Sequence, residues 1–165
     1  MKALSIRQPW AWAILHAGKR IENRSRKDGR APDLCRYIGP LLIHAAKGMT
    51  LIEYGSAGLF MAGMDIAAFQ GSLTNGPLVP EPAALPRGGI VGACNVVGWI
   101  GPNGDVYRAN GTRDRDEDLR WHVAGSFGLV LADVRPLPFV PFKGALGLFE
   151  VPDHLVPQAM TGGAA

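Results

Sequence analysis

Glycine and proline together make up more than a fifth of this 165-residue chain, with 22 Gly and 13 Pro. Glycine weakens the interior of helices and strands, and proline lacks the backbone N–H that both structures use. This density therefore favours many turns and short elements over long helices. The apolar fraction of 47% is still enough for a hydrophobic core, and the length suits one domain.

Hydrophobic patterning divides the chain into short strands and two helices. Alternating or continuous apolar runs predict strands over residues 2–6, 20–24, 41–44, 89–100, 127–131 and 145–151. Helical spacing predicts one helix over 9–17 that ends at Gly18, and a second over 50–69 with Thr50 as its N-cap. Gly92 and Gly98 are expected to allow bends in the long strand.

The segments between these elements carry the signals of loops. Polar residues, glycines and prolines predict loops over 26–40, 70–89 and 101–120, the last with alternating charges on a solvated surface. Pro136, Pro138 and Pro141 are expected to break the strand that precedes them. Five or six strands with two helices packed on them predict an α+β fold or a small β-barrel. We expect one domain over 1–152 and a frayed tail over 153–165.

Several classes of protein are excluded by missing signals. No window has the roughly 20 apolar residues of a membrane span, and Arg7, Gln8 and Pro9 stand where a signal peptide needs its apolar run, so a cytoplasmic protein without a membrane partner is expected. The two cysteines are expected to be core residues, and the four histidines lack zinc-site spacing, so we expect no metal. The glycine motifs of NTPases and dehydrogenases and the serine motif of α/β-hydrolases are absent, and no cofactor is expected.

Positive charge is concentrated near the N-terminus although the net charge is only +3. Residues 1–50 contain ten Lys or Arg and three acidic residues, so the remaining 115 residues carry a net charge of −4. A basic segment favours a polyanionic partner, because neutralising phosphates releases counterions. A merely solvated basic surface is an equally simple interpretation.

The densest cluster of polar side chains is Lys19, Glu22 and Arg24, directly after the first helix. Strand alternation places Glu22 and Arg24 on the same face. Such a pair can read the edge of a nucleobase, while Lys19 can contact a phosphate or, if desolvated, act as a base or nucleophile. The alternative is a surface ion pair of little energetic weight.

Two further segments supply candidate binding residues. Arg7 and Gln8 can make bidentate contacts beside Trp10, which offers either a stacking platform or an ordinary core residue. His44 and Lys47 follow a central strand, where a pocket can form, although a histidine satisfied by backbone is the commoner case. Residues 126–128 and 142–144 are weaker candidates.

Taken in order, these blocks resemble the ASCH domain family, chiefly its stand-alone bacterial and phage members. The resemblance covers about residues 3–152 and rests on segments 4–11, 18–24, 39–47, 89–92, 127–128 and 143–149. It implies a PUA-like β-barrel with a cleft between barrel and helices, and a role in binding RNA.

The resemblance also implies two possible activities. Some family members hydrolyse acetylated cytidine with a lysine, a threonine three residues later and a distant glutamate, and one bacterial member is a ribonuclease. Lys19 matches the lysine and Arg24 the motif arginine, but Glu22 replaces the threonine, and the strand over 91–99 has no acid for the glutamate.

The leading hypothesis is therefore binding of RNA or a modified nucleoside in one basic hollow. It requires the stretches that begin at Ile6, Gly18 and Ile43 to converge. Amide hydrolysis of an acetylated cytidine-type nucleoside through Lys19 and Glu22, ribonuclease activity involving Lys19, His44 and Lys47, and a protein-interaction role remain alternatives.

Overall fold

The computed structural model describes residues 1–24, 33–63, 79–114 and 117–156. Its strands are β1 Lys2–Ile6, β2 Ile21–Arg24, β3 Gly39–Ala45, β4 Gly89–Ile100, β5 Val106–Arg108, β6 Arg113–Asp114, β7 Phe127–Pro141 and β8 Leu148–Glu150. Its helices are α1 Trp10–His16 and α2 Leu51–Ala62, with 3-10 turns η1 Asp33–Arg36, η3 Leu119–Trp121 and η4 Asp153–Leu155. In these ranges neither helix has the length and apolar character needed to cross a bilayer.

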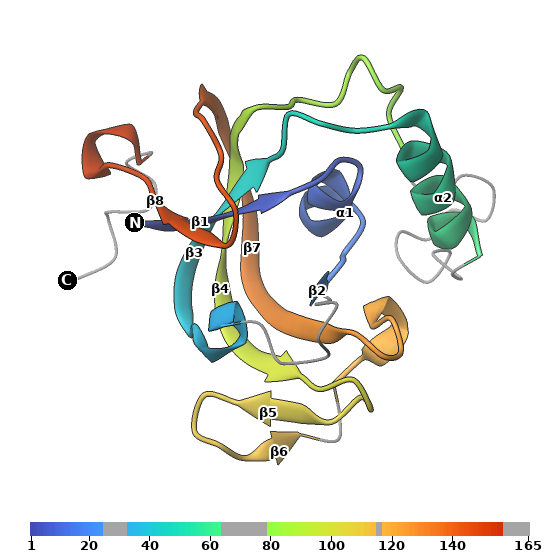
Figure 1. Cartoon of the computed structure of the whole chain (residues 1–165), viewed down its shortest axis with the longest axis vertical. Coiled ribbons are helices and arrows are strands. Elements are labelled where there is room, and N and C mark those ends of the chain that lie inside the picture. Colours follow the sequence, from blue (N-terminus) through green and yellow to red (C-terminus); the bar gives the residue numbers. More distant parts are fainter. Residues whose placement is uncertain (25–32, 64–78, 115–116, 157–165) are drawn as a thin grey trace.

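One mixed sheet organises the molecule, with the strand order β2-β7-β4-β3-β1-β8 and the β5–β6 hairpin attached to β4. β1 and β3 pair in parallel, whereas the other pairs are antiparallel. The long strands β4 and β7 curl around α1, and α2 lies outside this curl (Figure 1). The chain is thus an α+β fold built on a curled half-barrel, as the sequence predicts.

Small residues let α1 and the sheet approach closely. Ala11 and Ile14 of α1 are buried in a core cluster with residues of β1, β3, β4 and β7. A β-carbon on Gly92 would lie 2.3 Å from Leu15 Cδ2 and 2.9 Å from the Arg135 carbonyl oxygen. The β4–β7 register shifts between Ile90 and Gly92 and again between Val96 and Gly98. These irregularities accompany the bend expected at the two glycines.

Two expectations about strands are wrong. β7 runs through Pro136, Pro138 and Pro141 instead of ending before them. Beyond Leu131 it pairs only with β4 among the described strands, and proline is tolerated where one side of a strand has no ladder to complete. The predicted loop over 101–120 contains the β5–β6 hairpin, in which Arg108 pairs with Asp114 and Glu117.

Two other predicted segments are described only in part. At the start of the predicted tail over 153–165, residues 153–155 form η4 and Val156 is only 7% exposed. Residues 157–165 lie outside the described residues. Thr50 caps α2 through a reciprocal capping box with Glu53, as expected at its start, and the helix ends at Ala62. The predicted continuation over 64–69 also lies outside the described part of the chain.

Replacing Gly92 by alanine should destabilise the fold by about 1–3 kcal/mol, because the added methyl group has no space between Leu15 and β7. Gly55→Ala in α2 is the matched control: nothing lies within 4 Å of its β-carbon position, and alanine should stabilise the helix by about 0.5–1 kcal/mol. Urea unfolding curves measure both changes. Equal stability of the Gly92→Ala protein and the wild type would contradict this account of the β4–α1 contact.

Candidate functional site

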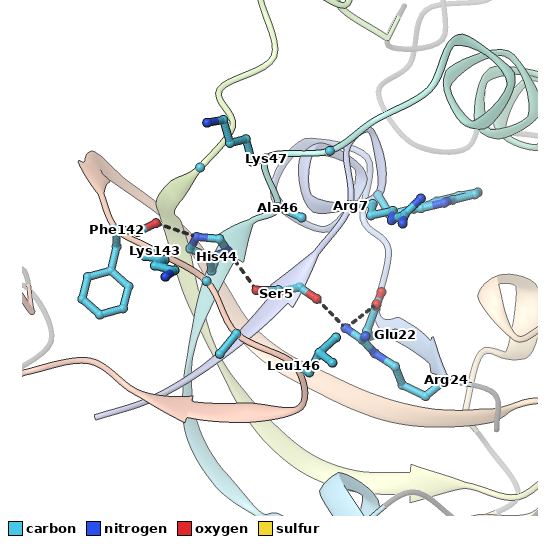
Figure 2. A pocket seen from close by; sticks show the side chains of 15 residues that line it. Ser5, Arg7, Glu22, Arg24, His44, Ala46, Lys47, Phe142, Lys143 and Leu146 are labelled. Carbon is cyan, nitrogen blue, oxygen red and sulfur yellow. Dashed lines mark hydrogen bonds and ion pairs between the residues drawn. The ribbon is translucent and has the colours of Figure 1, made fainter.

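A cleft of about 880 Å³ opens where β1, β2 and β3 meet the segment that follows β7. Six of the predicted site residues line it, and they come from all three expected stretches: Arg7, Trp10, Glu22, Arg24, His44 and Lys47. Figure 2 shows Arg24, Ser5 and His44 in a row linked by hydrogen bonds, with Lys47 and Lys143 beyond His44. The convergence on which the binding hypothesis depends is therefore present.

Lys19, Glu22 and Arg24 form a buried ionic network. Lys19 Nζ lies 2.9 Å from Glu22 Oε2 and also donates to the carbonyl of Ile21. Arg24 Nη2 lies 3.1 Å from Glu22 Oε1, as expected for side chains on one face of β2. The Lys19 and Glu22 side chains are only 3% and 9% exposed, which rules out the surface ion pair.

Burial sets the electrostatics of Lys19. Loss of water around the ammonium lowers the Lys19 pKa, Glu22 opposes this shift through its charge and hydrogen bond, and Arg24 adds a smaller lowering. Lys19 does not line the main cleft. Instead it faces an adjoining pocket of about 340 Å³ that shares Trp10 and Glu22 with the cleft.

Arg24 connects this network to β1. Its Nη2 donates to the carbonyl of Ser5 at 2.9 Å, in addition to the ion pair with Glu22. Its Nε is buried and has no hydrogen-bond partner among the described residues. A guanidinium held by two partners is restrained in orientation, so Arg24 is fixed at the wall of the cleft.

His44 is buried and hydrogen-bonded on both ring nitrogens. Its Nε2 lies 3.0 Å from the carbonyl oxygen of Phe142, which can only accept, so Nε2 carries a proton. Its Nδ1 lies 3.1 Å from Ser5 Oγ, which donates to it when the ring is neutral. His44 thus ties β3 to β1 and to the segment that follows β7, and it contributes to the lining of the cleft.

Gln8 is a correction to the predicted site, because it does not line the cleft. It is 2% exposed, its amide nitrogen donates to Pro86, and its oxygen accepts from the backbone N–H of Trp12. The polar side chain supports the first turn of α1 instead of a ligand. Arg7 does line the cleft, is 59% exposed and forms an ion pair with Glu53 of α2.

Ser5 lines the cleft although it is not among the predicted site residues, and residues 142–144 line it although their sequence gives only a weak signal. A β-carbon on Gly144 would lie 2.5 Å from both His44 Cε1 and Ser5 Oγ, so only glycine lets this segment pass over the two side chains. Lys143 next to it is exposed and lines the cleft. The Lys-Gly pair was the available signal, but nothing local shows which strand ends it crosses.

The described residues contain neither the ligand cluster of a metal site nor a cysteine with a lowered pKa. Among the described residues, no three His, Cys, Asp or Glu side chains come together as metal ligands would. Cys35 and Cys94 are buried as expected, and burial raises the pKa of Cys35 to about 11 and that of Cys94 to about 12. Both thiols therefore stay protonated near neutral pH, where a nucleophile would need the thiolate.

Removing the Glu22 charge should strongly destabilise the protein. Glu22→Gln leaves Lys19 buried without a counter-charge, a situation that costs about 3–5 kcal/mol. The double variant Lys19→Met, Glu22→Gln should recover much of the loss, because the uncompensated ammonium is gone. Thermal and urea unfolding measure the free energy of unfolding of the wild type, the two single variants and the double variant. If the loss in the double variant equals the sum of the losses in the single variants, Lys19 and Glu22 do not interact.

Comparison with known proteins identifies one family whose sequence model matches this chain. The family model described as the ASCH domain matches residues 4–113, two thirds of the chain, which includes part of β1, all of β2 to β5 and both helices. A search of curated proteins found no match.

Proposed function

We propose that this chain, which belongs to the ASCH domain family and its PUA-like superfamily, binds RNA or a modified nucleoside in the cleft at the ends of β1, β2 and β3. The observation that carries the proposal is the convergence of four cationic side chains on that cleft. Arg7, Arg24, Lys47 and Lys143 line it, against the single carboxylate of Glu22. A hollow with this charge favours phosphate groups.

The cations differ in how they meet a ligand. Lys47 and Lys143 are exposed and lie near the His44 ring, where flexible ammonium groups can reach backbone phosphates (Figure 2). Arg24 is held by Ser5 and Glu22 and presents a fixed planar group. This difference supports a role for the lysines in contacting phosphates and a role for Arg24 in orienting the ligand.

Trp10 supplies an apolar surface at the boundary of the cleft. Its ring is partly exposed and lines both the cleft and the adjoining pocket. Stacking of a base on an aromatic ring contributes about 1–3 kcal/mol and is available to any unpaired base. Because single-stranded RNA exposes its bases, this arrangement suits unpaired RNA better than a duplex.

Removing the two exposed lysines should weaken RNA binding and its salt dependence together. For Lys47→Ala with Lys143→Ala, the slope of log K against log salt should become shallower by about 1.4, since each lost phosphate contact on a single strand removes about 0.7. Fluorescence anisotropy with a labelled single-stranded RNA of mixed sequence, titrated at several salt concentrations, measures this slope.

Arg36→Ala is the matched control, because Arg36 is exposed on η1, just before the opposite end of β3. It should leave both affinity and slope unchanged. RNA binding that is absent, independent of salt, or weakened equally by Arg36→Ala would overturn the assignment of this cleft.

Amide hydrolysis of an acetylated cytidine-type nucleoside is the second candidate function, favoured by the buried Lys19 beside Glu22. Burial lowers the Lys19 pKa, and a lysine acts as a base or nucleophile only as the neutral amine. Against it stands the ion pair itself, in which Glu22 holds the Lys19 ammonium at 2.9 Å.

An assay with N4-acetylcytidine separates the two functions. If Lys19 is catalytic, cytidine should accumulate, and the rate should rise with pH and level off below the usual lysine range, because a lowered pKa releases the proton earlier. Lys19→Met should abolish the product, while Arg36→Ala should retain it. Retention of the acetylated nucleoside without any cytidine on chromatography would leave binding as the function.

A further inference from the structure

The pocket beside the cleft is small, and aromatic rings form one part of its wall. Its volume of about 340 Å³ lies at the lower end for ligand pockets, so it suits one ring system and not a whole oligonucleotide. Trp10, Phe60 and Trp121 contribute to its lining. The Trp10 and Phe60 ring centroids are 5.7 Å apart and those of Phe60 and Trp121 are 6.0 Å apart, so the three rings form a continuous wall.

The pocket adjoins the main cleft, since Trp10 and Glu22 line both spaces. A base held in the pocket beside these two residues would have its sugar and phosphate next to the cleft. A bound nucleotide would then be divided between an apolar pocket and a basic cleft.

Asn23 lines the pocket and is bonded to the protein through both its amide nitrogen and its oxygen. The nitrogen donates to the carbonyl of Trp121 at 2.8 Å, and the oxygen accepts from Val123 N–H at 2.9 Å and from Ser126 Oγ at 3.1 Å. These bonds use the oxygen and one of the two N–H donors, and they hold the segment that carries the Trp121 ring. Asn23 is thus a positioning residue for the aromatic wall.

Glu22 and Lys19 retain the hydrogen-bonding capacity that a base edge needs. A carboxylate has about four acceptor positions, and Lys19 and Arg24 each take one among the described contacts. The Lys19 ammonium has three donors, of which Ile21 and Glu22 take two. Glu22 and Lys19 therefore offer two adjacent acceptors beside one donor, at groups that are themselves almost fully buried.

This pattern matches one of the four common bases best. Guanine presents two neighbouring donors, N1–H and the N2 amino group, followed by the acceptor O6. Adenine and cytosine each place one donor group next to an acceptor nitrogen, and uracil places one donor between two carbonyl oxygens, so each would set an acceptor against the carboxylate. We infer that the pocket selects guanine, with Glu22 accepting from N1–H and N2–H and Lys19 donating to O6. The inference rests on the proposed binding of RNA or nucleosides and names the base that this same site takes.

The decisive measurement compares GMP with IMP, which differ only in the N2 amino group, using isothermal titration calorimetry on the wild-type protein. A hydrogen bond to a charged group contributes enough that GMP should bind at least about tenfold more tightly than IMP. AMP, CMP and UMP should bind no better than IMP. Equal affinity for GMP and IMP, or tighter binding of any other member of the panel, would overturn guanine selection.

The result separates this inference from the proposed function. Salt-dependent binding of mixed-sequence RNA together with equal GMP and IMP affinities would retain the function and reject guanine selection. If the protein neither bound RNA nor preferred GMP to IMP, both the proposed function and guanine selection would be rejected. As a second readout, Phe60→Ala should lower the affinity for GMP several-fold by removing part of the aromatic wall, whereas Leu59→Ala on the same helix, where Leu59 is 78% exposed and does not line the pocket, should not.

Discussion

The Glu22 carboxylate is the group on which the arrangement of the site depends. It is nearly buried, and burying a carboxylate costs far more than any surface contact returns unless it is paired. Lys19 from the turn after α1 and Arg24 from the end of β2 provide that pairing. The pairing fixes the direction in which α1, β2 and β1 meet, because Arg24 also holds the Ser5 carbonyl.

The same carboxylate separates two environments with different chemistry. On one side lies a wide, basic cleft, and on the other a small pocket with aromatic walls. Both contain Glu22 and Trp10, so a ligand that spanned them would lie beside the buried Glu22–Lys19 pair, the Trp10 ring and the cationic side chains of the cleft. Ligands with only one of these features would use part of the site, which is why separate probes for phosphate and base are informative.

Much of the fold follows from local patterns, because those patterns report directly on burial. The bounds of β4 agree with its predicted apolar run over 89–100, and α2 begins at its predicted cap. The prolines of β7 misled the prediction, since whether a proline breaks a strand depends on which neighbours the strand has, and that is a tertiary property. The role of Gln8 also depends on tertiary neighbours, because its side chain is hydrogen-bonded to the backbone of Pro86 and Trp12. Six site residues could be found because charged and aromatic types clustered in motifs, whereas Ser5 gave no chemical signal of its own.

The pairing of β1 with β8 joins the two ends of the described chain, since Lys2 lies opposite Glu150 and Leu4 opposite Leu148. During synthesis on the ribosome, the second edge of the first strand therefore stays uncovered until residues 148–150 have emerged. Contacts this distant in sequence are slow to form, and an edge left open can pair with another chain. Lys143 and Gly144 line the cleft as well, so a nascent chain cannot complete that cleft before these two residues have emerged.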